Sequence, residues 1–434
     1  MSNLDPRLPL IQNAPIDGKI VLVRFDHNVV KAGQIRDPYR IDRTLGTLYN
    51  IVERGGRPIL MTHIGRPKDA KTGEITCRME ESVKPVVEYL QRKLHIKFHV
   101  PEFPIAPGTG IAGIDTSVNL AIRDLRERRI GGIYLPNTRW FQGEDADDEN
   151  RRKFALQLAG LADIFINDAF GSWQSHTSTV NITKHLPSYA GFLMQQEIIN
   201  LGMVIDPKRP FIAVVAGSKY DTKIKPLYAL YEKVDKLILG GVIYNTYLCA
   251  KYGIKIAGVT ESDIGLARDL VEKDRVRQKI IELPYIVESD SIEGRFEGRF
   301  RRISVKDFRR GNAYNYILDI DPVSFEDSLV YESIFQAKTI FVNAVMGLTP
   351  HFSAGSAALD STIDHNSTAI KMYGGGDTLQ EFKDLCPGLY LSVLDDAHYY
   401  FFTGGGTVLS AIEQGTPYGL GPVQALMENR EKFA

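Results

Sequence analysis

The sequence alternates short apolar runs, rich in β-branched residues, with longer amphipathic stretches. This alternation is typical of parallel strands joined by crossover helices, because a strand that is buried on both faces reads as a continuous apolar run. The apolar runs are 19–25, 57–63, 96–100, 131–137 and 162–168 in the first half, and 211–217, 236–241, 255–259, 339–345, 368–376 and 389–394 in the second. We therefore predict an α/β chain with two doubly wound, Rossmann-like parallel sheets, one in each half.

The length of the chain indicates more than one hydrophobic core. At 434 residues it exceeds what a single core usually supports, so we expect two domains. The predicted boundaries are an N-terminal domain over 1–187, an interdomain helix over 188–206 and a C-terminal domain over 207–413. The remaining segment, 414–434, is expected to return to the N-terminal domain.

The charge balance limits the classes of partner. A formal net charge of -1 argues against a general nucleic-acid or membrane binder, so any positive site must be local. The arginine-rich stretch 291–311 could form a basic patch, but its interleaved Glu293, Glu297 and Asp307 favour a surface hairpin. The three cysteines are far apart, and the sequence has neither a signal-peptide layout nor a membrane-length apolar run. We expect a cytoplasmic protein without nucleic-acid or membrane partners.

Polar and charged side chains follow several strands that are predicted in the first half, where ligands of open parallel sheets bind. Those at strand ends are Asp26, Asn28, His63, Arg66 and Arg139, and Arg40 opens the next helix. Cations gathered at one sheet edge repel each other unless an anion neutralises them, and the guanidinium group suits bidentate binding of carboxylate or phosphate. The sequence therefore predicts a small polyanionic ligand, whose hydroxyl groups would bind to Asp26 and Asn28.

One histidine adds an open question to this site. His176 lies in the polar loop 171–179, which follows the last strand of the first half. It could join the anion site, although a lone loop histidine is more often structural.

Lysines and glycines follow the strands of the second half. Gly217 ends a strand and is followed by Lys219 and Lys223, which are four residues apart and would repel each other without a shared anion. Gly240 and Gly241 end the next strand. Glycines at such turns let backbone N–H groups approach a ligand closely, and the helix that follows favours negative charge at its start.

Two triple-glycine turns, at 374–376 and 404–406, each open a predicted helix. Together with the lysine pair they favour a nucleotide-phosphate site. Asp377 follows the first turn and suits magnesium, a hard cation that takes one or two carboxylates together with phosphate oxygens. We predict phosphoryl transfer in a cleft that domain closure completes, because this chemistry depends mainly on positioning and charge neutralisation.

The motifs occur in an order that resembles the phosphoglycerate kinase family over nearly the whole chain. They are "VRFDHN", "THIGRP", "NTRWFQGE", "NDAFG", "LPSYAGFLMQQEI", "GSKYDTK", "LILGG", "NAVMG", "GGGDT" and "TGGGT". The resemblance implies a magnesium-dependent, hinge-bending kinase of glycolysis. It would transfer phosphoryl reversibly between ATP and the carboxylate of 3-phosphoglycerate, giving ADP and 1,3-bisphosphoglycerate, and would act as a monomer.

The resemblance also implies roles for individual residues. Those implied to hold 3-phosphoglycerate are Asp26, Asn28, Arg40, His63, Arg66 and Arg139. Those implied for the nucleotide are Gly217, Lys219, Lys223, Gly240, Gly241, Asn343, Gly375, Gly376, Asp377 and Thr378, with Asp377 also contacting magnesium. The implied catalytic set is Arg40, Lys219, Gly376 and Gly405. Because the second triple-glycine turn has no acid, we expect replacement of Gly405 to lower the rate more than it weakens nucleotide binding.

The chain departs from the family pattern at peripheral positions. The segment "GSWQSHTS" lacks the arginine that helps the family bind the substrate phosphate, and "NAVMGLTPH" lacks the glutamate expected at the ribose hydroxyls. Two alternatives follow: a divergent paralogue that phosphorylates another small carboxylate, and a non-catalytic binding protein on the same fold. The choice between ATP and GTP is also open.

Overall fold

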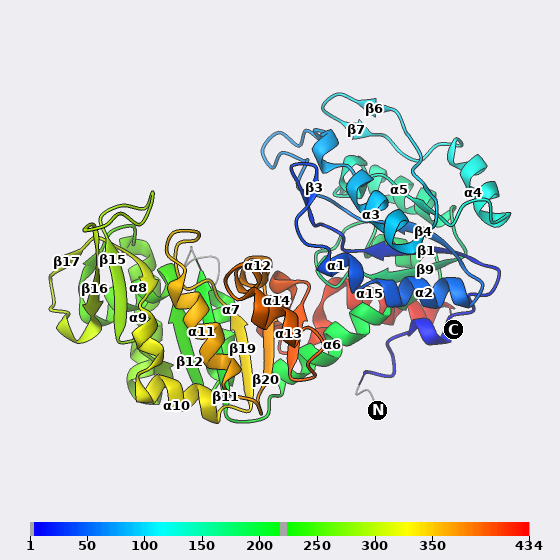
Figure 1. The fold of residues 1–434 in the computed structure, drawn as a ribbon. Coiled ribbons are helices and arrows are strands. Elements are labelled where there is room, and N and C mark those ends of the chain that lie inside the picture. Colours follow the sequence, from blue (N-terminus) through cyan, green and yellow to red (C-terminus); the bar gives the residue numbers. More distant parts are fainter. Residues whose placement is uncertain (1–3, 218–223, 434) are drawn as a thin grey trace. The chain divides into compact units, whose positions relative to one another are not determined.

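The computed structural model describes residues 4–217 and 224–433, which form two compact units (Figure 1). The first unit combines the chain up to Ile199 with the segment from Pro417 onward, and the second contains Asn200–Thr416. The boundary between them falls inside helix α6 (Phe192–Ile205). Among the described residues, no helix has the length and apolar character needed to cross a bilayer.

The first unit is built on a six-stranded sheet whose neighbouring strands are all parallel. Its spatial order is β10 (Ser188–Ala190), β9 (Ile164–Asp168), β1 (Ile20–Phe25), β4 (Arg57–Met61), β8 (Gly132–Tyr134) and β5 (Phe98–His99). The central strand β1 is buried along its whole length, which explains its uninterrupted apolar run.

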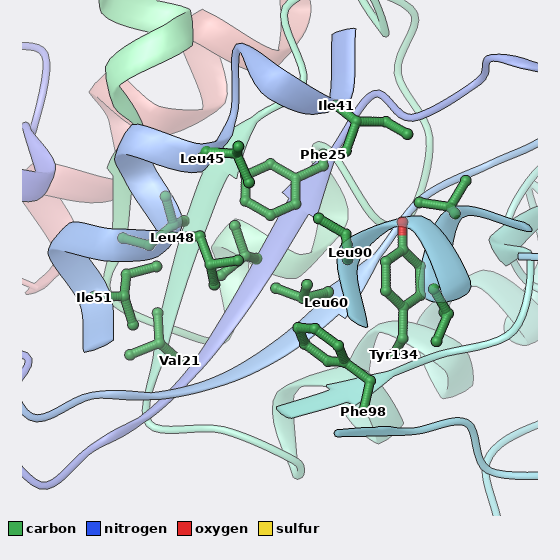
Figure 2. Close-up of a cluster of buried hydrophobic side chains, with 14 of the residues drawn as sticks. Val21, Phe25, Ile41, Leu45, Leu48, Ile51, Leu60, Leu90, Phe98 and Tyr134 are labelled. Atoms are coloured by element: carbon green, nitrogen blue, oxygen red, sulfur yellow. The ribbon is translucent and has the colours of Figure 1, made fainter. Parts of the chain in front are cut away.

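Helices cover both faces of this sheet. On one face, α2 (Leu45–Glu53) and α3 (Lys84–Leu94) pack against alternate residues of β1, such as Val21 and Phe25, as Figure 2 shows. On the other face, α4 (Val118–Arg126) and α5 (Glu149–Ala159) pack against Ile20 and Leu22. The alternation of β1 side chains between two separate cores is the doubly wound arrangement that the sequence predicted.

The second unit repeats this architecture, which confirms the prediction of two doubly wound parallel sheets. Its six parallel strands are β14 (Ile280–Ile281), β12 (Lys236–Gly240), β11 (Phe211–Gly217), β19 (Thr339–Asn343), β20 (Ile370–Gly374) and β21 (Tyr399–Phe402). Its helices are α7 (Ile224–Lys233), α8 (Gly241–Tyr252), α9 (Glu261–Arg277), α10 (Ser328–Gln336), α11 (Ala354–Asp364), α12 (Gly376–Leu385), α13 (Pro387–Val393) and α14 (Gly405–Gln414).

Two strand predictions in the second half were wrong. The run 389–394 lies mostly in helix α13, where Pro387 takes a first-turn position and Leu391 is 69% exposed. The sixth strand is instead β21, a four-residue aromatic run that sequence periodicity did not single out. The run 255–259 contributes only β13 (Lys255–Ile256), which pairs with β17 (Ala313–Tyr314) outside the main sheet.

A separate antiparallel sheet lies in the second unit. It contains β16 (Phe300–Ser304), β15 (Tyr285–Ser289) and β18 (Tyr316–Ile320), in that order. Strands β15 and β16 form a hairpin across the arginine-rich stretch, where Arg301 pairs with Glu288 and Arg299 pairs with Asp290. The antiparallel pairing of β15 and β16 confirms the predicted hairpin, although the acids in these two ion pairs are Glu288 and Asp290, which precede the stretch 291–311.

The described end of the chain packs on the first unit. Helix α15 (Gly421–Phe433) contacts β10 and the 3₁₀ helix η4 (Asn181–Lys184). The buried side chain of Asn429 accepts a hydrogen bond from Ser188 N at 2.8 Å and donates to Leu186 O at 2.9 Å. These bonds satisfy backbone groups that would otherwise be buried without partners.

A buried carboxyl group lies where the first sheet meets α6. Asp168 ends β9, and its Oδ1 accepts a hydrogen bond from Met194 N, in the first turn of α6, at 2.9 Å. Burial raises the pKa of Asp168 to about 7. Hydrogen bonds from the backbone amides of Met194 and Leu193 and from the hydroxyl of Thr47 lower the pKa, but burial has the larger effect.

This pKa shift predicts a pH dependence of stability. Because the folded pKa of Asp168 lies above its unfolded value of 3.8, its contribution is complete below pH 3.8 and is lost as the pH rises towards 7, by about 1.4 kcal/mol per pH unit. We expect Asp168→Asn, which mimics the protonated acid, to remove this loss. The test is urea unfolding at pH 5 and pH 7.5, followed by tryptophan fluorescence, since Trp140 and Trp173 both lie in the first unit.

The comparison of Asp168→Asn with the parent protein separates the effect of Asp168 from the effects of titratable groups that act in the opposite direction. Burial lowers the pKa of His27 to about 3, so that histidine makes the fold more stable as the pH rises towards 6.5. Both proteins share that effect. Equal pH dependence in the two proteins would contradict the assignment to Asp168.

Candidate functional site

The polar residues predicted in the first half gather at one edge of the first sheet. Asp26 and Asn28 follow β1, His63 and Arg66 follow β4, and Arg139 lies in the 3₁₀ helix η3 (Thr138–Trp140) after β8. Because β1, β4 and β8 are neighbouring parallel strands, their carboxyl ends lie side by side. Arg40, in the short helix α1 (Tyr39–Asp42), reaches the same edge through an ion pair with Asp26, 3.6 Å between Nη1 and Oδ2.

Hydrogen bonds through Gly65 join two more of these side chains. Asn28 Oδ1 accepts from Gly65 N at 3.0 Å, and Arg139 Nη1 donates to Gly65 O at 2.6 Å. The Asn28 carbonyl oxygen therefore holds the loop after β4. The predicted role of Asn28 towards hydroxyl groups of a ligand stays a prediction.

Asn137 is a positioning residue that the sequence analysis did not single out. Its buried side chain accepts from Ile64 N at 3.0 Å and from Arg139 N at 3.1 Å, and donates to Ile64 O at 2.7 Å and Glu81 O at 3.0 Å. All of its hydrogen-bonding capacity is used to fix the loop after β4 against η3. The family-like motif "NTRW" was the available signal, but only the structure assigns this task to its asparagine.

Arg24 determines the protonation state of His63. Arg24 Nη2 lies 2.9 Å from His63 Nδ1, and since a guanidinium group can only donate, Nδ1 must be the acceptor. The single proton of the imidazole is then on Nε2. Burial, followed by the nearby charges of Arg24 and Arg139, lowers the pKa of His63 well below its usual value. His63 is therefore a neutral hydrogen-bond donor at the candidate anion site.

The Arg24 guanidinium is itself fully buried and needs acceptors on every side. Its Nε donates to Ser178 Oγ at 2.9 Å, and Ser178 Oγ donates to Glu144 Oε1 at 2.6 Å. Glu144 is 1% exposed and also accepts from Ser178 N at 3.0 Å. A cation and a carboxylate are thus buried together and linked through one hydroxyl. Because Arg24 lies inside an apolar run, hydropathy alone gave no reason to place it at the site.

The loop after β9 contributes a second histidine. His176 forms an ion pair with Asp145 through Nδ1, and Asp145 Oδ2 lies 3.9 Å from Arg139 Nε. Burial acts to raise the pKa of Asp145, but the bond to His176 and the charge of Arg139 outweigh it, so the pKa is lowered. His176 thus stands beside the anion site. Within the described residues, the exposed Arg66 guanidinium has no ion-pair partner.

The glycines predicted in the second half lie around one cavity of about 520 Å³ in the second unit. Those lining it are Gly217, Gly241, Gly375 and Gly376, together with Asn343, Asp377 and Thr378. Gly240 ends β12 directly before α8, although the cavity lining does not include it. The helices α8 and α12 both begin at the cavity, and the start of a helix favours a negatively charged group. Lys219 and Lys223 lie outside the described residues.

The two triple-glycine turns pack against each other, which explains why the chain has both. A Cβ atom on Gly405 would overlap the backbone of Gly375, including its nitrogen at 2.7 Å. Gly375 has a φ of +120°, which L side chains rarely adopt, and the Asn343 amide donates to Gly374 O. Replacement of Gly405 must therefore displace the first turn as well. It cannot separate rate from nucleotide binding as the sequence suggested.

The residues around Asp377 fit magnesium bound to a nucleotide phosphate. Asp377 is exposed in the first turn of α12 and lines the cavity. The described residues contain no group of three or more histidine, cysteine or carboxylate side chains arranged around a metal. A single carboxylate suits Mg²⁺ when phosphate oxygens and water supply its other ligands.

Comparison with known proteins gives consistent results. A profile described as phosphoglycerate kinase matches residues 11–415. Proteins named phosphoglycerate kinase from Rubrobacter xylanophilus and Roseiflexus sp. are 33% and 34% identical, each match covering 93% of this chain and 95% of the relative. The solved phosphoglycerate kinase of Coxiella burnetii is 27% identical with a TM-score of 0.73, and covers 97% of this chain and 99% of its own.

A solved relative with lower sequence identity has the same fold. Phosphoglycerate kinase from Pyrococcus horikoshii is 22% identical, with a TM-score of 0.76 over 98% of this chain and 100% of its own. At this identity the likeness concerns the fold alone.

The buried pair of Arg24 and Glu144 predicts strong energetic coupling. Arg24→Met leaves the Glu144 carboxylate buried without a compensating cation, and we expect a loss of about 3–5 kcal/mol in the free energy of unfolding of the first unit. Glu144→Gln should also destabilise, because it leaves the Arg24 charge without its carboxylate. The double variant should lose clearly less than the sum of the two single losses. Urea unfolding followed by tryptophan fluorescence measures all three, and additive losses would contradict the pairing.

Proposed function

The chain belongs to the phosphoglycerate kinase family, and from this premise we propose which of its residues carry the reaction. The family's activity is phosphoryl transfer to a carboxyl group, in glycolysis. The observation that supports our assignment is that one chain pairs a cationic sheet edge with a glycine-lined cavity at the carboxyl edge of a second sheet. The first suits the phosphorylated carboxylate 3-phosphoglycerate, and the second suits ATP or ADP.

In the first unit, we assign the acceptor to the cluster around Asp26. Arg40, Arg66 and Arg139 bind its anionic groups, and His63 donates from Nε2, which Arg24 leaves protonated. Asp26 accepts a hydrogen bond from the hydroxyl of the acceptor while it keeps Arg40 in place. Because His63 is neutral, it contributes a hydrogen bond but no positive charge to the site. The positive charge that attracts the anion comes from the three arginines.

In the second unit, we assign the nucleotide to the glycine-lined cavity. The first turns of α8 and α12 bind phosphate oxygens through backbone N–H groups, and Asn343 and Thr378 add side-chain contacts. Lys219 and Lys223 are assigned to the nucleotide phosphates from the family resemblance. Asp377 would hold Mg²⁺, which when bound neutralises charge on the phosphates.

The reaction needs no proton transfer. A carboxylate oxygen of 3-phosphoglycerate forms a bond to the γ-phosphorus of ATP, and the bond from that phosphorus to the bridging oxygen breaks, so that ADP leaves with the electron pair. The chain therefore needs no general base. Its task is to bring the two substrates together and to neutralise charge on the moving phosphoryl group, which we assign to Arg40, Lys219 and the turn at Gly376.

We also propose a cytoplasmic monomer without a nucleic-acid or membrane partner. The formal net charge of -1 provides no general attraction for polyanions.

A steady-state assay with 3-phosphoglycerate and ATP tests the assignment. We expect Arg40→Ala to lower kcat by about 10²–10³-fold, because it removes a cation that faces developing charge. Lys219→Ala should give a loss of the same order. Arg36→Ala is the matched control, since Arg36 is an exposed arginine of the same segment. Activity in Arg40→Ala that equals the activity of the control would contradict the mechanism.

The same assay separates the nucleotide side from the acceptor side. Asp377→Asn should raise the magnesium concentration needed for half-maximal rate and leave the KM for 3-phosphoglycerate unchanged. Glu332→Gln, at an exposed carboxylate of α10 that does not line the cavity, is the control. A variant at Asp377 with an unchanged magnesium requirement would rule out the metal role of that residue.

A further inference from the structure

Glu381 places a buried carboxylate in the wall of the glycine-lined cavity. It lies on α12, four residues after Asp377, so the two side chains share one face of the helix. Its side chain is 5% exposed, yet it is one of the residues that line the cavity. Thr349 Oγ1, from the loop after β19, donates to Glu381 Oε1 at 2.6 Å.

The cavity has two chemically different parts, and Glu381 is connected to both. One part is formed by glycines at the carboxyl edge of the sheet and at the start of α12. The other is apolar and contains Leu318 of β18 and Leu348, whose backbone N donates to Leu318 O at 2.8 Å. Thr349 follows Leu348 directly, so its bond to Glu381 ties the apolar part to α12 one helical turn beyond the phosphate-binding end.

The charge of Glu381 selects what can lie beside it. Burial raises the pKa of Glu381, against the hydroxyl groups of Ser356 and Thr349, which lower it. An ionised carboxylate only accepts hydrogen bonds, so it repels phosphate oxygens and gains nothing from the apolar face of a base. Sugar hydroxyl groups meet its requirement, since each can donate one hydrogen bond. In a nucleotide, the sugar also lies between the phosphates and the base.

We propose that Glu381 accepts hydrogen bonds from the ribose hydroxyls of the bound nucleotide, and that it makes this cavity select ribonucleotides over deoxyribonucleotides. This inference rests on the proposed nucleotide site. The hydroxyl groups of Thr349 and Ser356 use part of the accepting capacity of the carboxylate and orient it, and a carboxylate has about four acceptor positions in all, so capacity is left for a ligand hydroxyl. A hydrogen bond to a charged acceptor corresponds to a difference in affinity of about ten- to a hundredfold.

The test compares substrates as well as variants. Values of kcat/KM are measured for ATP, 2′-deoxy-ATP and 3′-deoxy-ATP with 3-phosphoglycerate as acceptor, in the parent chain, in Glu381→Ala and in the isosteric Glu381→Gln. We expect the parent to prefer ATP over at least one deoxynucleotide by about tenfold or more. In Glu381→Ala this ratio should fall towards one, because KM rises for ATP and stays nearly constant for that deoxynucleotide. Glu381→Gln should give an intermediate ratio and guards against misfolding of the alanine variant.

Controls separate ligand recognition from support of the fold. Glu332→Gln replaces an exposed carboxylate of α10 (Ser328–Gln336) that does not line the cavity, and it should leave the ratio at the parent value. A purely structural Glu381 would lower the rates with all three nucleotides equally, and an unchanged ratio in both Glu381 variants would overturn the inference. A parent chain that uses ATP and both deoxynucleotides equally would also overturn it, with the proposed function intact. No turnover with any nucleotide would overturn the proposed function and this inference together.

Discussion

A guanidinium group cannot be buried without acceptors for its donors, and the first unit is organised around this requirement at Arg24. The side chain is 0% exposed at the end of the central strand β1. It finds its acceptors in the Phe25 carbonyl, in Ser178 from the loop after β9 and in His63 from the end of β4. Glu144 supplies the compensating charge through Ser178. The cost of an unpaired buried charge thus keeps the ends of three strands in fixed register, and the candidate anion-binding residues extend from these same segments.

In the second unit, the segments that follow the strands are also held in fixed positions, but by packing of backbone groups and not by buried charged side chains. Its two triple-glycine turns approach so closely that Gly405 has no room for a Cβ beside Gly375. The starts of α12 and α14 are therefore held together by backbone packing. The absence of side chains fits the proposal that backbone N–H groups of these turns bind phosphate. The glutamate expected at the ribose hydroxyls is absent from the loop after β19, but the loop's Thr349 binds Glu381 of α12, which places a carboxylate in the same cavity.

The sequence predicted most of the architecture because buried parallel strands and strand-end residues leave clear patterns. It failed at 389–394, where a short apolar run fits a strand and a helix equally well, and it missed β21 for the same reason. It predicted Asp26, His63 and Arg139 as site residues from their positions after apolar runs, and the structure places these residues at one edge of the first sheet. It could not identify Arg24, Asn137 or Glu381, because their tasks depend on partners from 32 to 154 residues away. Tertiary packing determines which of these distant residues meet, and the residue pattern of a single strand or helix carries no information about such contacts.

The arrangement of the first site depends on Arg24, which holds His63 as a neutral donor with its proton on Nε2. The most direct test is ¹⁵N NMR of the imidazole nitrogens in the histidine-labelled chain, with His63 assigned from the spectrum of His63→Gln. We predict that between pH 6 and 8 the Nδ1 of His63 gives the chemical shift of an unprotonated nitrogen and Nε2 that of a protonated one, and that neither shift changes with pH. An imidazolium pattern, or a proton on Nδ1, would contradict it.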